Sequence, residues 1–172
     1  MMLPREAPAT WAECNAFLET LPPDALAIAA EEAARAALLS ANGLADAGAT
    51  AAIRAVEAVA LWRAQRIEPD ALKPAAEAAY HAAHTSAHPP GSPERSIAFA
   101  AAHAAFAAFF LSQRVGADPG MKQKVFAAAR NACEYANAAA GGTWKEFSAP
   151  WARHWWSECI RRLEGAAPPP HG

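Results

Sequence analysis

Long alanine tracts constrain the fold of this 172-residue chain more than any other feature, among them AIAAEEAARAALL (27–39) and AFAAAHAAFAAFF (98–110). Alanine favours the helix because its side chain loses no rotamer freedom when the backbone becomes helical. Valine and isoleucine are scarce, and no run alternates apolar and polar residues with a period of two. The sequence therefore offers no candidate strand and predicts an all-α fold.

The chain length is typical of one domain, and we expect a single helical domain over residues 1–165 with a flexible, proline-rich tail over 166–172. Short connections between helices favour an antiparallel bundle of about six to seven helices. The proline, glycine and capping residues predict helices at about 10–20, 24–41, 48–66, 69–88, 92–115, 118–141 and 143–165.

Three of these helix starts carry specific capping signals. Thr10 is the expected cap of the first helix, and Ser92 followed by Pro93 opens the fifth. Residues 143–146 read Thr-Trp-Lys-Glu, the pattern of a capping box, and predict the start of the last helix. Pro150 then falls inside that helix, where we expect a kink.

The overall charge argues against nucleic acid as a partner. The formal net charge is −2, and the basic residues are dispersed, whereas phosphate binding needs clustered lysine or arginine.

No segment has the length and apolarity of a membrane span, and residues 97–111 come nearest but include His103. The N-terminus lacks the pattern of a signal peptide. The three cysteines form no CxxC pair, so we expect a soluble cytoplasmic protein with reduced thiols.

A histidine stripe is the clearest candidate for a metal site. Glu77, His81, His84 and His88 follow one another at spacings of four, three and four, which places all four on one face of a helix. Histidines one turn apart can share a zinc or another divalent ion, with a carboxylate as a further ligand. The alternative is that these histidines line a half-exposed helix face and bind no cofactor.

Signals for catalysis are weak. The sequence contains no GxSxG, GxGxxG, P-loop or HExxH motif. The adjacent pair Glu31 and Glu32 diverges by about 100° on a helix, which indicates a solvated face and not an acid–base pair. His103 lies in a stripe with Phe99, Phe106 and Phe110, so we expect it in the core with one ring nitrogen hydrogen-bonded. A non-catalytic protein is therefore the expectation.

The last predicted helix carries an unusual concentration of tryptophan beside arginine, two residue types that are enriched at protein interfaces. One interpretation is a partner-binding surface. The other is that the aromatic residues pack on the first helix and close the bundle. An oligomeric scaffold, such as a homodimer joined through this helix, is a further alternative. The candidate partner-binding residues are Trp151, Arg153, His154, Trp155, Arg161 and Arg162.

Four segments resemble the all-helical, alanine-rich immunity proteins that bacteria encode beside polymorphic toxins. They are AIRAVEAVALWRAQRI (52–67), AAEAAYHAAHTSAH (75–88), AFAAAHAAFAAFF (98–110) and HWWSECIRRL (154–163). That family has a helix of the form Ala-Ile-x-Ala-x-x-x-Trp, then two helices with His-Ala-Ala, then a helix with tryptophan, acid and Arg-Leu. The segment WAECNAFLE (11–19) is similar to the family's opening helix.

The resemblance implies a cytoplasmic protein that binds a cognate toxin and blocks it, with no chemistry of its own. A modestly acidic chain would suit a toxin with a basic active site. The rival hypothesis is a helical bundle that binds a metal or a small ligand through the histidine stripe.

Overall fold

The computed structural model describes residues 6–40, 47–113, 119–143 and 145–166, and every regular element in them is helical. The predicted all-α class is confirmed. The predicted helix boundaries at about 41, 115 and 118, residue Trp144 of the capping pattern, and the tail after Ala166 lie outside the described residues. The elements are α1 (Trp11–Glu19), α2 (Pro23–Ser40), α3 (Ala47–Arg63), a short 3-10 turn η1 (Pro69–Ala71), α4 (Leu72–His84), α5 (Pro93–Ser112), α6 (Pro119–Ala139) and α7 (Ala149–Ala166).

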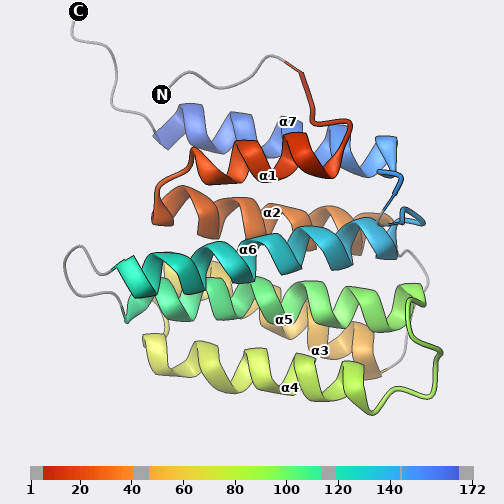
Figure 1. Ribbon diagram of the computed structural model, residues 1–172. Helices are drawn as coiled ribbons and strands as arrows, with labels where there is room; N and C mark the ends of the chain where they lie inside the picture. Colours follow the sequence, from red (N-terminus) through yellow and green to blue (C-terminus); the bar gives the residue numbers. More distant parts are fainter. Residues whose placement is uncertain (1–5, 41–46, 114–118, 144, 167–172) are drawn as a thin grey trace, which may run out of the picture.

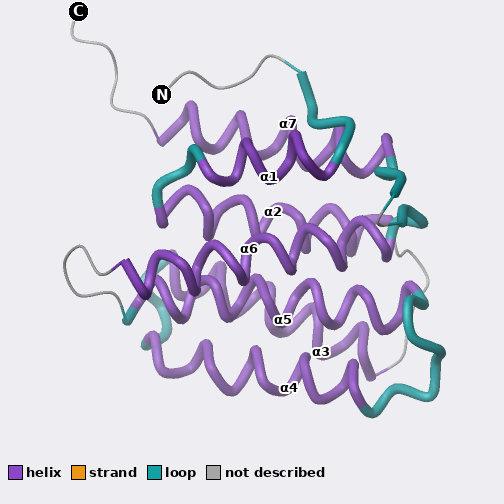
Figure 2. Tube along the Cα trace, in the orientation of Figure 1, coloured by secondary structure: helices purple, strands orange, loops and turns teal. Residues whose placement is uncertain are grey.

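Successive helices run in alternating directions, as the short connections predict (Figure 1). α1 and α7 form one outer layer, α2 and α6 lie beneath them, and α3 and α4 close the opposite side (Figures 1 and 2). α5 lies in the middle and contacts α2, α3, α4 and α6. Four of the other helices therefore surround α5, and α1 and α7 cover the side formed by α2 and α6 (Figure 1).

Alanine explains the position of α5. All eight of its alanines are fully buried, so the helix is apolar on nearly all sides, as a core helix must be. A methyl side chain lets neighbouring helices come close.

Because α5 is long and apolar, it also meets the length and composition of a membrane span, although 56% of that window is buried in the bundle. The sequence expectation that no segment approaches a span has to be corrected for this helix.

α7 is fixed to α2 by tryptophan side chains that reach its backbone. The indole N–H of Trp155 donates to the carbonyl of Ala29 at 2.9 Å, and that of Trp151 donates to the carbonyl of Ala33 at 3.3 Å. The acceptors belong to alanines, whose small side chains leave the helix backbone accessible. Residues 151 and 155 are one turn apart, so their indoles stack in parallel with centroids 5.3 Å apart.

α4 ends four residues earlier than predicted. Its last residue is His84, and both the N–H and the hydroxyl of Thr85 donate to the carbonyl of His81 at 2.9 Å. The two prolines that follow at 89 and 90 disfavour helix in the residues before them. His88 therefore lies in the turn and not on the helix.

The start of α7 also differs from the prediction. Thr143 closes a turn, in which its hydroxyl accepts from the N–H of Glu146 at 3.1 Å and its own N–H donates to the Glu146 carbonyl at 2.8 Å. The helix begins only at Ala149, so Pro150 occupies its first turn, where a missing N–H costs no hydrogen bond, and does not kink it. The predicted caps at Thr10 and Ser92 are confirmed.

Candidate functional site

Helices α4, α5 and α6 bring seven rings together on one side of the bundle, which we call the aromatic face. The four from α5 lie four, three and four residues apart and so project from one side of that helix. α4 adds two rings one turn apart, and α6 adds one. The members are Tyr80, His84, Phe99, His103, Phe106, Phe110 and Tyr135.

His103 lies at the centre of this face. Its ring stacks on Tyr135 with centroids 5.6 Å apart and planes only 1° from parallel. Tyr80 meets it edge-on at 6.0 Å, and Phe106 lies 6.3 Å away. The hydrogen bonds found among the described residues include none from this ring, so the expected hydrogen bond is replaced by aromatic contacts. Stacked and edge-on geometries are those in which ring pairs attract one another.

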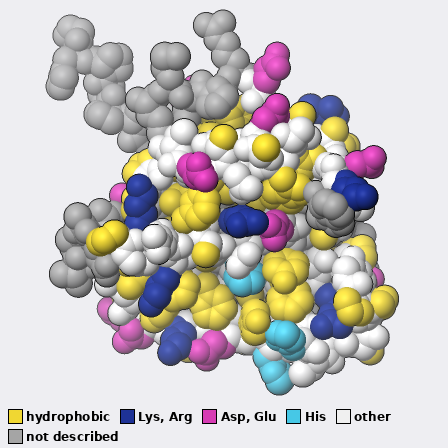
Figure 3. Space-filling model, viewed as in Figure 1, with side chains coloured by type: hydrophobic (Ala, Val, Ile, Leu, Met, Phe, Trp, Pro, Cys, Tyr) yellow, Lys and Arg dark blue, Asp and Glu magenta, His cyan; other side chains and the backbone are white. Residues whose placement is uncertain are grey.

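Only the base of the aromatic face is fully covered. Phe99 is buried, whereas His103, Phe106, Phe110 and Tyr135 are half-buried and Tyr80 is 39% exposed. Figure 3 shows hydrophobic and histidine side chains gathered over α4, α5 and α6 on the side seen in Figure 1. These helices thus present an apolar, aromatic surface to the solvent.

A groove of about 340 Å³ runs along this surface between α5 and α6. Phe106 and Phe110 form one wall, and the small side chains of Ala127 and Ala128 form the other. Lys124 stands at the rim, with its ammonium group 5.8 Å from the centre of the Phe110 ring. The groove is therefore apolar inside and positively charged at one edge.

Burial sets the charge state of the face. It lowers the pKa of His103 from 6.5 to about 4, so the ring is neutral at neutral pH. Burial, together with the nearby Tyr80 and Glu134, raises the pKa of Tyr135. The two stacked rings at the centre therefore present a neutral surface, and the groove is suited to aromatic and aliphatic groups.

The predicted metal ligands do not converge. His88 has left the helix, and its Nδ1 lies 3.9 Å from a carboxylate oxygen of Glu94. Glu77 is exposed and pairs with a lysine one turn away. His81 and His84 are both exposed, and the ring of His84 meets Phe99 edge-on at 5.2 Å. In the described ranges, no group of three or more His, Cys, Asp or Glu side chains is placed to hold a metal ion.

The predicted partner-binding residues of α7 divide into two groups. Trp151 and Trp155 are buried against α2, and Phe17 of α1 contacts Trp155 and Trp156 at ring distances of 6.1 and 4.8 Å. These tryptophans therefore close the bundle, which was the alternative interpretation, and Arg162 forms an internal ion pair.

The remaining residues of that set are exposed on the outer side of α7. They are Arg153, His154 and Arg161. The guanidinium of Arg161 donates to the Glu158 carboxylate at 2.8 Å and holds the pKa of that carboxyl below its usual value.

The acid pair in α2 is buried, which corrects the expectation of a solvated face. Arg162 of α7 donates to Glu32 at 2.7 Å and also to Glu31. Arg63 of α3 donates to Glu31 at 3.2 Å. Two guanidinium groups thus neutralise two buried carboxylates and join α2 to α3 and α7. Sequence reasoning missed this cluster because its arginines lie 32 and 130 positions away from the acids.

The three cysteines, which lie far apart in the sequence, are all buried and belong to α1, α6 and α7. The thiol of Cys133 contacts that of Cys14. Burial raises the pKa of Cys133 and of Cys159 well above the usual range, with a smaller contribution from neighbouring groups. A protonated, covered thiol is a poor nucleophile, so these side chains act as core residues.

Comparisons of the chain with protein-family models, with curated proteins and with solved structures found no match.

Proposed function

We propose that this protein is an immunity protein, which binds a toxin made by the same bacterium and blocks it without catalysing a reaction. The observation that carries the proposal is the origin of the aromatic face. Residues 75–88 and 98–110, two of the four segments that resemble immunity proteins, lie on α4 and α5, and these helices supply six of its seven rings.

The physical character of the face supports a role in binding a protein. Half-exposed phenylalanine and tyrosine side chains lose water when a partner covers them, and aromatic residues dominate the binding energy of many interfaces. Phe106 and Phe110 are already held by their contacts with each other, so little side-chain entropy is lost when a partner binds. The face thus has the composition and the rigidity of a binding surface.

The proposed location of this protein and its type of partner follow from the toxin it would bind. The toxin would act in the cytoplasm, so we place this protein there, acting on another protein and not on nucleic acid. The net charge of −2 favours approach to a basic toxin at long range. The apolar groove then supplies the close contacts.

The proposal is tested by expressing this chain together with the product of the neighbouring gene. Growth should be rescued, and the two proteins should purify as one complex. Phe106→Asp places a charge in the groove and should abolish both rescue and co-purification. Leu39→Asp is the matched control, because Leu39 is 60% exposed on α2, away from the aromatic face. A harmless neighbour that does not co-purify, or equal rescue by both variants, would contradict the proposal.

The groove also favours a second function, the binding of a small aromatic ligand. Its volume of about 340 Å³ lies in the range of small-molecule sites. A thermal-shift screen with indole and phenolic compounds separates the two functions. A compound that raises the melting temperature of the native chain but not of Phe106→Asp would support ligand binding.

A further inference from the structure

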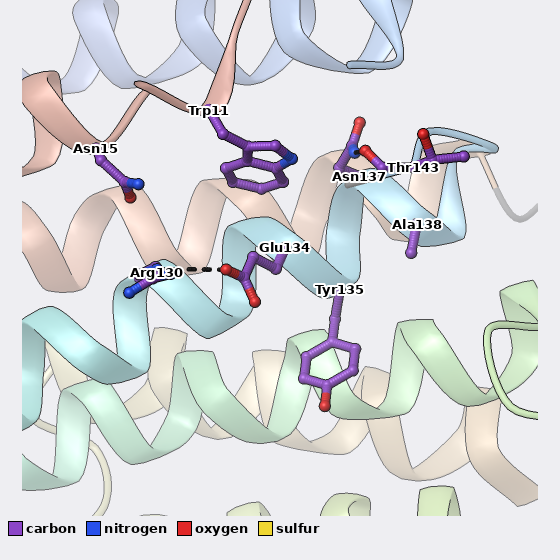
Figure 4. Close-up of a pocket in the computed structure, with 8 residues that line it drawn as sticks. All are labelled: Trp11, Asn15, Arg130, Glu134, Tyr135, Asn137, Ala138 and Thr143. Carbon is purple, nitrogen blue, oxygen red and sulfur yellow. Dashed lines mark hydrogen bonds and ion pairs between the residues drawn. The ribbon is translucent and has the colours of Figure 1, made fainter. Parts of the chain in front are cut away.

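Whereas the aromatic groove lies between α6 and α5, a second depression lies between α6 and α1. It has a volume of about 440 Å³, and we call it the α1–α6 pocket. Figure 4 shows Trp11 and Asn15 of α1 facing Arg130 and Glu134 of α6 across this space. The pocket contains both aromatic and charged groups, which distinguishes it from the apolar groove.

One polar atom in this pocket has no partner. The side-chain oxygen of Asn15 is covered from solvent and, among the described residues, receives no hydrogen bond. A covered acceptor without a donor costs free energy, so a ligand that brings an N–H to this oxygen, once the Asn15 side chain turns toward the pocket, would be stabilised there. The observation points to a ligand that carries hydrogen-bond donors.

Glu134 supplies a second acceptor. Its Oε1 accepts from Nε of Arg130 at 3.3 Å, a single contact that leaves Oε2 available. The side chain of Glu134 is 43% exposed. By contrast, Asn137 is buried, and it donates to the carbonyl of Thr143 at 3.1 Å and accepts from the N–H of Ser148 at 2.7 Å. Its amide is thus held within the protein and forms a wall of the pocket.

Trp11 supplies a flat surface beside these acceptors. Its ring is half-buried and is supported by Phe147, with ring centroids 4.6 Å apart. Cations bind over the face of tryptophan, and a guanidinium both stacks on the ring and donates several hydrogen bonds in its plane. Among side chains, arginine therefore matches this set of a carboxylate, an unpaired amide oxygen and an indole best.

We propose that the α1–α6 pocket receives an arginine side chain of the protein partner. This inference rests on the proposed function, because it assigns to the toxin a basic residue that the pocket holds. Tyr135 connects the two sites, since the residue lines the α1–α6 pocket while its ring, which points from α6 toward α5, belongs to the aromatic face (Figure 4). One partner lying across α6 would cover both.

The experiment titrates the full-length protein with N-acetyl-L-arginine amide and follows the Trp11 indole N–H by NMR. The matched probe is N-acetyl-L-citrulline amide, which has the same shape and no charge. We expect saturable binding of the arginine compound in the millimolar range and about tenfold weaker binding of citrulline, because the charge-assisted hydrogen bond to Glu134 is lost. Equal binding of both compounds, or none, would overturn the inference.

Two variants should change the affinity for the arginine compound in opposite directions. Glu134→Gln should weaken binding of the arginine compound about tenfold, whereas Arg130→Gln should strengthen it, because a competing cation is removed. A pocket for anions would reverse the second result and overturn the inference. Glu77→Gln, on the exposed side of α4, is the control, and urea unfolding of each variant establishes that it is folded.

The rescue assay distinguishes this inference from the proposed function. If Phe106→Asp abolishes rescue and Glu134→Gln leaves toxin affinity unchanged, the arginine pocket is refuted and the immunity function stands. If both variants weaken the complex, both proposals are supported.

Discussion

Acid should destabilise this protein through one histidine in particular. In the folded state His103 has a pKa of about 4 because burial disfavours its charged form. In the unfolded chain its pKa returns to about 6.5. Between these two values the unfolded state binds a proton that the folded state does not. The stabilisation from the neutral ring is therefore complete above about pH 6.5 and is lost as the pH falls toward 4.

The magnitude follows from the two pKa values. Each tenfold difference in proton affinity is worth about 1.4 kcal/mol, so a fall from 6.5 to about 4 corresponds to about 3 kcal/mol once the pH is below both values. Between pH 7 and pH 5 the loss is about 2 kcal/mol. Solvent reaches one edge of the half-buried ring and reduces this, so we expect a loss of between about 1 and 2 kcal/mol.

Urea unfolding followed by circular dichroism at about pH 7 and pH 5 measures this loss. His103→Phe keeps a ring that can stack on Tyr135 and removes the titration. The variant should therefore lose about 1 to 2 kcal/mol less than the native chain over this interval. His81→Gln, which removes an exposed histidine, should lose as much as the native chain. Equal losses in the native chain and in His103→Phe would refute the reasoning.

Three further perturbations have clear expected outcomes. Arg162→Met leaves the carboxylate of Glu31 with one partner fewer and should lower the free energy of unfolding by about 3 to 5 kcal/mol. Urea unfolding measures this change, and a loss below about 1 kcal/mol would contradict a stabilising role for the buried ion pairs. Gly142→Ala places a Cβ 2.2 Å from Oδ1 of Asn137 and should cost about 2 kcal/mol by the same assay, whereas unchanged stability would show that this turn adjusts freely. The buried thiols should react with Ellman's reagent only after urea unfolds the chain, and fast reaction of the native protein would contradict their burial; they are Cys14, Cys133 and Cys159.

The helical fold was predictable because its determinants are local. Alanine tracts, the cap at Thr10 and the Ser92–Pro93 start each act within a few residues, and each was confirmed. The two boundary errors arose where two local signals compete. Near His88 the following prolines outweighed the continuing alanine pattern, and near Thr143 the capping pattern formed a turn because Pro150 favours the first turn of a helix.

The candidate site was predictable only in part. The stripe from Phe99 to Phe110 could be read from helical spacing, since all its members lie on one helix. Its completion by Tyr80 and Tyr135 depends on how α4 and α6 dock, which no spacing within one helix encodes. The same limit hid the burial of Glu31 and Glu32. A weak signal was present, since two adjacent acids in an otherwise apolar tract require a partner if that tract is buried.

The alanine core has a consequence for how this protein can change over generations. In α5 most buried positions already hold alanine, the smallest side chain that favours a helix, so nearly any replacement there adds atoms to a space that is full. Glycine removes atoms but weakens the helix. Substitutions that the fold tolerates should therefore be rare in the central helix and more frequent on the exposed surfaces. A protein whose partner evolves quickly would keep this interior fixed and vary the outer rings and charges that the partner touches.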